Sequence, residues 1–185
     1  MVSFKRNFFS RLFSLIPLLI LLFLSFSGID FNFEKLSFLS FNLVYILIFY
    51  WVLKNPDILG YGFIFLAGIV NDVVSGLPIG VSSVTYLILA GFAAYIRHLT
   101  VQPSLIYDWI VFVPSIAVTN SVYFYILGMF FDIEINYISL ALNTGVTILF
   151  YPVIGILFSF LANIIIKAKH GRSSKEGKAA RHRLA

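Results

Sequence analysis

Apolar runs alternate with short polar segments along the whole chain. There are six such runs, and their lengths approach or exceed the ~20 residues that an α-helix needs to cross the hydrocarbon core of a membrane. The runs are Leu12–Phe26, Phe38–Leu53, Ile58–Gly76, Val81–Ile96, Trp109–Phe131 and Tyr137–Ile166. Most of the charged residues lie between them. This pattern predicts an all-α integral membrane protein with six transmembrane helices.

The first run has a second interpretation. It follows the basic residues Lys5, Arg6 and Arg11, and a short apolar run after a basic start is also typical of a secretory signal peptide. Ser25–Ser27 offers only a poor cleavage site for such a peptide. We favour an uncleaved first helix, because two phenylalanines before Leu12 lengthen the run.

Prolines and serines mark the ends of several runs. Pro56 restricts the residue before it, so Lys54–Asp57 is predicted to form a tight turn that ends the second helix. Ser82 and Ser83 are placed to cap the start of the fourth helix. The last run exceeds the length of one span, and Pro152 is expected to kink it or the helix to tilt.

Charge determines the orientation of the six helices. With the N-terminus inside the cell, twelve of the thirteen basic residues lie in cytoplasmic segments and only Lys35 is exported. The twelve are Lys5, Arg6, Arg11, Lys54, Arg97, Lys167, Lys169, Arg172, Lys175, Lys178, Arg181 and Arg183. The positive-inside rule therefore predicts N-in and C-in. We assign residues 1–170 to the transmembrane domain and residues 171–185 to a basic cytoplasmic tail, expected to be disordered and able to contact anionic lipid.

Composition supports the membrane interpretation and excludes several other classes. The chain is 60% hydrophobic and 11% charged, whereas a soluble domain carries about 25% charged residues. It has no cysteine, which rules out disulfides and thiol chemistry. The formal net charge of +5 follows from topology, so we expect no nucleic-acid partner.

Enzyme chemistry is not indicated by the remaining polar residues. His98, His170 and His182 all fall in predicted cytoplasmic segments, and none has the spacing of a metal-binding motif. An acid–base pair needs two positioned groups, and the apolar runs contain a single acid, Asp72. We therefore expect no enzymatic activity, no cofactor and no metal.

The stretch Gly60–Gly80 carries the strongest local signal. Gly68, Asp72 and Gly76 are spaced four residues apart, which would place them on one face of a helix. Pro78 and Gly80 then form a turn that a helix cannot continue through. One interpretation is that this face contacts a partner or ligand. The other is that Asp72 accepts hydrogen bonds from the backbone amides between Gly80 and Ser83, and so braces the turn onto the fourth helix.

Other polar residues inside the apolar runs are expected to form hydrogen bonds between helices. They are Asn42, Asn71, Thr119, Asn120, Asn143, Thr144 and Thr147. A ligand pocket would require several of them to converge.

The segment from Tyr50 to Arg97 resembles the bacterial rod shape-determining MreD family. The resemblance covers roughly a quarter of the chain and rests on a few residues. These are Tyr50, Trp51, Pro56, Phe65 to Gly68, Asp72, the run Gly76–Leu77–Pro78–Ile79–Gly80, and Arg97.

The resemblance implies a role and not a reaction. Proteins of this family are non-enzymatic scaffolds of the cell-elongation machinery in the bacterial inner membrane. They act in cell-shape maintenance and peptidoglycan synthesis with the bitopic protein MreC, the actin-like MreB, and a RodA-type synthase paired with a class B penicillin-binding protein. The family is similar in architecture to the six-helix substrate-binding subunits of energy-coupling-factor transporters, and this similarity supplies the alternative function.

Overall fold

A computed structural model describes residues 15–27, 41–55, 58–99, 104–131 and 137–181. Within these residues the chain forms six α-helices and no strand. They are α2 (Ile16–Ser27), α3 (Leu43–Lys54), α4 (Tyr61–Ser75), α5 (Val81–Leu99), α6 (Leu105–Phe131) and α7 (Tyr137–Arg181). The predicted all-α class and the number of helices are therefore confirmed.

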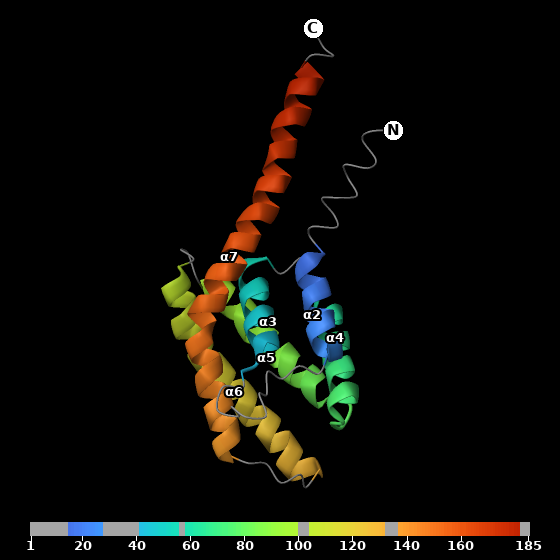
Figure 1. Ribbon diagram of the computed structural model, residues 1–185, viewed down its shortest axis with the longest axis vertical. Helices are drawn as coiled ribbons and strands as arrows, with labels where there is room; N and C mark the ends of the chain where they lie inside the picture. The colour runs from blue at the N-terminus through green and yellow to red at the C-terminus, as the bar shows by residue number, and fades with distance from the viewer. Residues whose placement is uncertain (1–14, 28–40, 56–57, 100–103, 132–136, 182–185) are drawn as a thin grey trace.

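Successive helices run in alternating directions between the two ends of the bundle (Figure 1). The start of α2 and the C-terminal part of α7 lie at the same end, which is uppermost in Figure 1. The end of α3 and the start of α6 lie at this end as well. The α4–α5 turn, the end of α6 and the start of α7 lie at the opposite end.

Helix α3 forms the centre of the bundle. Every residue from Val44 to Leu53 is buried, so the helix has no solvent-facing or lipid-facing side. It contacts α2, α5, α6 and α7. Aromatic rings make up much of this contact: Phe49 meets Phe112 of α6 with ring centroids 5.0 Å apart, and Phe112 stacks on Tyr151 of α7 at 4.4 Å. An all-round apolar sequence such as LVYILIFYWVLK suits a helix with no polar face.

The boundaries of α6 and α7 differ from the prediction. Helix α6 begins at Leu105 instead of Trp109, because the Ser104 side chain accepts a hydrogen bond from the Tyr107 amide (3.2 Å) and so caps the helix. Helix α7 continues to Arg181, beyond the predicted end of the last run at Ile166. No proline follows Pro152, and adding residues to a formed helix requires no new nucleation.

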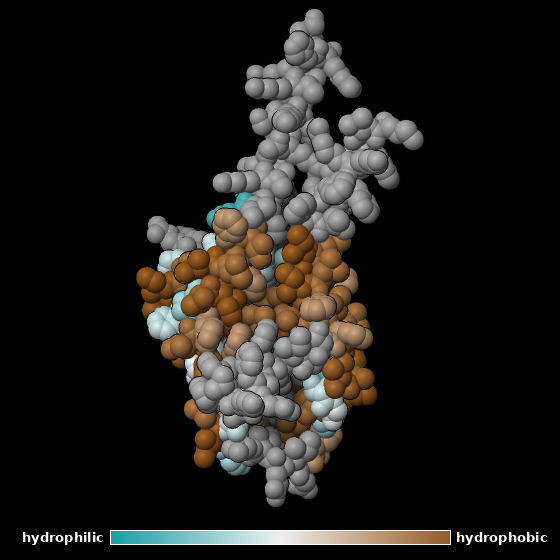
Figure 2. Space-filling view, viewed as in Figure 1, coloured by the Kyte–Doolittle hydropathy of each residue, from teal (hydrophilic) through white to brown (hydrophobic). Residues whose placement is uncertain are grey.

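Two helices are long and apolar enough to span a membrane, Leu105–Phe131 and Tyr137–Asn163. By length and composition alone they indicate an association with a membrane. Hydrophobic side chains also cover most of the described surface visible in Figure 2. Large exposed hydrophobic residues include Phe23, Phe63, Ile110, Leu149 and Phe160.

Candidate functional site

The stretch with the strongest sequence signal forms a helical hairpin between α4 and α5. Gly76 follows the last residue of α4 with φ of 66°, and Gly80 precedes α5 with φ of 107°. Both values are left-handed conformations that glycine adopts without steric cost. Because α4 ends at Ser75, Gly76 belongs to the turn and does not extend the face that carries Gly68 and Asp72. Pro56, the other predicted turn residue, lies outside the described residues.

The Asp72 side chain braces this turn. It is fully buried, and its two oxygens accept hydrogen bonds from the backbone amides of Gly80 (2.7 Å) and Ser82 (2.9 Å). These amides belong to the start of α5, where the first N–H groups of a helix have no partner within the helix. A carboxylate there is also favoured by the positive end of the helix dipole. The structural interpretation of Asp72 is confirmed.

Ser82 and Ser83 do not cap α5, as the sequence had suggested. Helix α5 already begins at Val81, so both serines lie in its first turn. Their side chains point to α4 instead: Asn71 donates to the Ser82 hydroxyl (3.0 Å), and the Ser83 hydroxyl donates to the carbonyl of Phe65 (3.0 Å). The hairpin is thus held by four polar contacts between α4 and the first turn of α5 or the residue before it.

Gly68 allows the close approach of the two helices. A Cβ atom built on Gly68 would lie 2.5 Å from the backbone nitrogen of Ser83, and backbone atoms cannot move aside as the end of a side chain can. Gly68 is buried in this crossing. Small residues are the usual means by which two helix backbones come into contact in membrane proteins.

Gly68→Ala is expected to destabilise the hairpin by about 1–3 kcal/mol, the typical cost of overpacking. Gly62→Ala is the matched control, because a Cβ at Gly62 meets no atom within 4 Å and alanine is the better helix former. Thermal unfolding of both variants in mild detergent would measure the difference. Equal stability of the two would contradict the crossing described here.

The burial of Gly68 and Asp72 corrects one interpretation. The face that these residues share with α5 is already occupied, so it cannot receive a partner's helix. The physical reason is that α5 and the residue before it provide the hydrogen-bond donors for Asp72 and the closely packed backbone at Gly68. An external partner was expected to provide both. The tip of the hairpin remains exposed, with Ile79 73% exposed.

Several polar residues of the apolar runs form hydrogen bonds between helices, as predicted. Asn120 of α6 donates to Thr144 of α7 (2.6 Å). The backbone amide of Asn42, at the start of α3, donates to the Thr147 hydroxyl (2.9 Å). Thr119 differs, because its hydroxyl donates to the Ser115 carbonyl of its own helix.

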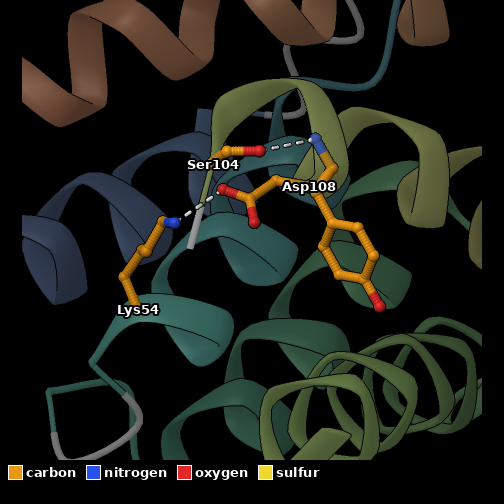
Figure 3. A network of polar contacts seen from close by, with 4 residues as sticks. Lys54, Ser104 and Asp108 are labelled. Carbon is orange, nitrogen blue, oxygen red and sulfur yellow. Dashed lines mark hydrogen bonds and ion pairs between the residues drawn. The ribbon is translucent and has the colours of Figure 1, made fainter. Parts of the chain in front are cut away.

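The sequence analysis missed a buried ion pair. The Lys54 ammonium lies 2.6 Å from the Asp108 carboxylate, which joins the end of α3 to the first turn of α6 (Figure 3). The Asp108 side chain is only 1% exposed, while that of Lys54 is 20% exposed. Each charge also suits its helix end, since a cation is favoured at a C-terminus and an anion at an N-terminus.

A signal for this pair was present in the sequence. Lys54 and Asp108 are opposite charges that directly flank two apolar runs, and the predicted topology places both at the cytoplasmic end. Asp108 was instead assigned to a loop, because the first turn of α6 was not recognised. An acid that directly precedes an apolar run, together with a basic residue that ends another run on the same side, therefore indicates such a pair.

A shallow groove lies on the outward surface of α6. Its volume is about 340 Å³, and it is lined by Ala117, Val118, Ser121, Val122 and Tyr125. All five residues belong to one helix, and Ala117 and Ser121 are four residues apart, so their small side chains lie on one face. The Ser121 hydroxyl donates to the carbonyl of Ala117 (2.8 Å), so its proton is already satisfied within α6.

The polar contacts of these sites join helices to one another. Among the described residues, no three His, Cys, Asp or Glu side chains come close enough to hold a metal ion. Asp72 and Asp108 are each engaged by a partner of their own. No protein-family model matches the chain, and comparisons with curated proteins and with solved structures give no significant match.

Proposed function

We propose that the protein is a non-enzymatic scaffold that crosses the bacterial inner membrane six times, with both termini in the cytoplasm. The alternating helix directions support this topology, because they bring the end of α3, the end of α5 and the C-terminal part of α7 to one end (Figure 1). Lys54 and Arg97 belong to this end, as do the basic residues that follow the apolar part of α7. That is the charge asymmetry expected of a cytoplasmic side.

Exposed aromatic residues support a membrane–water boundary at the basic end of the bundle. At the basic end, Tyr61 begins α4, Tyr95 lies near the end of α5, and Tyr107 and Trp109 lie in the first turns of α6. Their side chains are between 37% and 65% exposed. Tyrosine and tryptophan are enriched where a membrane meets water, because their rings are apolar and their tips polar. These four residues would form an aromatic belt at the cytoplasmic interface.

The observation that carries the functional proposal is the braced α4–α5 hairpin. The glycines, Asp72 and the turn on which the resemblance to the MreD family rests form one structural unit, held by the contacts of Asp72 and Gly68. We therefore propose a role in the rod complex, in cell-shape maintenance and peptidoglycan synthesis. The partners would be an MreC-like bitopic protein, a RodA-type synthase with its class B penicillin-binding protein, and MreB.

The groove on α6 is the surface that we assign to a partner's transmembrane helix. Helices associate in lipid through close packing at small residues, and Ala117 and Ser121 provide such a position on an outward face. The rest of the groove wall is supplied by Val118, Val122 and Tyr125. A bitopic partner has a single transmembrane helix to offer, which fits a groove formed by one helix.

Filling the groove is expected to abolish co-purification of the bitopic partner without unfolding the protein. The variant is Ala117→Leu with Ser121→Leu, and the readout is the amount of partner recovered with the tagged protein from its native cells. Ala141→Leu on α7 is the control for the Ala117→Leu half of the variant, because it makes the same substitution at an exposed position outside the groove. Undiminished recovery with the filled groove would contradict this assignment of the interface.

A further inference from the structure

Helix α4 is short for a helix that faces lipid. It is bounded by Gly60 and Gly76 and contains 15 residues, which corresponds to about 22 Å at a rise of 1.5 Å per residue. The side chains of Phe63, Phe65 and Val73 on this helix are all exposed. The hydrocarbon core of a typical bilayer is about 30 Å thick. Helix α3 is shorter still, but it is enclosed by protein and need not match the lipid.

The uncharged part of helix α5 has a similar length to helix α4. From Val81 to Arg97, the first charged residue after the turn, the helix rises by about 24 Å. Between Tyr61 and Tyr95 the only charged residue is the buried Asp72. If the basic end of each helix lies at the cytoplasmic edge of the hydrocarbon core, the turn at Gly76–Gly80 falls roughly 6–8 Å short of the opposite edge of an unperturbed core.

The backbone of the turn nevertheless needs polar surroundings. The amides of Gly76 and Leu77 both donate to the Asp72 carbonyl, and Pro78 has no amide proton. The last carbonyls of α4, from Val73 to Ser75, are thus left for water or lipid headgroups. Such groups are costly in hydrocarbon, which places the turn at the polar boundary of the membrane.

The α6–α7 hairpin extends farther. Helix α6 and the apolar part of α7 each contain 27 residues, or about 40 Å. In Figure 1 the end of α6 and the start of α7 lie beyond the α4–α5 turn at the exported end. Among the described residues, the exported surface is therefore stepped, because the α6–α7 hairpin reaches farther than the α4–α5 turn.

We propose that the bilayer is thinned around the α4–α5 side of the protein, so that headgroups of the exported leaflet come down to the Gly76–Gly80 turn. Lipid, and not a partner helix, occupies the outer surface of the α4–α5 hairpin. This surface is apolar and uncharged, and it ends at backbone groups that need hydration. Asp72 serves the same geometry, because it satisfies the amides of Gly80 and Ser82, which face the protein. This inference rests on the membrane placement proposed above.

Spin labels at single cysteines would test the thinning, since the chain contains no native cysteine. Ile79→Cys reports the tip and Tyr95→Cys the cytoplasmic end of the same hairpin. Leu149→Cys lies at an exposed position in the middle of the apolar part of α7. Its label serves as the reference for a position inside the hydrocarbon core. The full-length protein is reconstituted in phosphatidylcholine vesicles with monounsaturated chains of 14 to 22 carbons. Collision with oxygen and with a water-soluble nickel complex then gives the depth of each label.

Thinning predicts that the labels at Ile79 and Tyr95 are both several-fold more accessible to nickel than the label at Leu149, even in the thickest bilayers. If the label at Ile79 or at Tyr95 were as inaccessible to nickel as the label at Leu149, the inference would be overturned. Protection of the Ile79 label from both reagents would also overturn it, because a second copy of the chain would then cover the tip. Nickel access at Leu149 would contradict the membrane placement itself, and the proposed function with it.

Discussion

Replacing Asp72 with leucine is expected to destabilise the α4–α5 hairpin more than any other single change within it. The substitution removes the acceptors of the Gly80 and Ser82 amides and leaves both without a partner. Each buried amide that loses its acceptor costs about 1–3 kcal/mol. The measurement is thermal unfolding in mild detergent, followed by circular dichroism.

Asp72→Asn provides the graded control. Asparagine keeps one side-chain oxygen but replaces the other with an NH₂ group, which cannot accept a hydrogen bond. One of the two amides should therefore remain satisfied, and the loss of stability should lie between wild type and Asp72→Leu. If Asp72→Leu were as stable as the wild type, the carboxylate would not be the brace described here.

The second large effect is expected at the Lys54–Asp108 pair, and it should be asymmetric. Removing one member of a buried ion pair typically costs about 3–5 kcal/mol, because the other charge is left uncompensated. Lys54→Met strands a carboxylate that is 1% exposed. Asp108→Leu leaves a lysine that is already 20% exposed and whose long side chain can reach water. The loss of stability should therefore be larger for Lys54→Met.

The double variant Lys54→Met/Asp108→Leu completes this test. Replacing both partners of a buried pair with apolar residues is often neutral or stabilising. We expect the double variant to recover most of the stability that Lys54→Met loses. Additive losses in the double variant would show that the two charges act independently and would contradict the pairing seen in Figure 3.

Much of the fold could be predicted from the sequence because apolar runs and their breaks are local signals. Six runs predicted six helices, and the glycines and proline of Gly76–Gly80 marked the hairpin turn. The hydrogen bonding of Asp72 could also be anticipated. A buried carboxylate needs donors, and the start of the next helix lies only eight residues away.

The features that were missed depend on contacts between distant segments or on weak local preferences. The Lys54–Asp108 pair joins residues 54 positions apart, and the charges that flank the two apolar runs do not by themselves show that the two helix ends meet. The close crossing at Gly68 depends on which face of α4 meets α5. The extent of α7 was missed because its final part is rich in charged and small residues, a composition that favours disorder unless a preceding helix continues into it.

The most direct test of the proposed function is purification of the tagged protein from its native cells in gentle detergent, with mass spectrometry of the proteins that accompany it. The account predicts recovery of a bitopic coiled-coil protein together with a RodA-type synthase and its class B penicillin-binding protein. Recovery of a membrane coupling subunit with two ATPases would contradict it, and would favour the substrate-binding subunit of a small-molecule transporter.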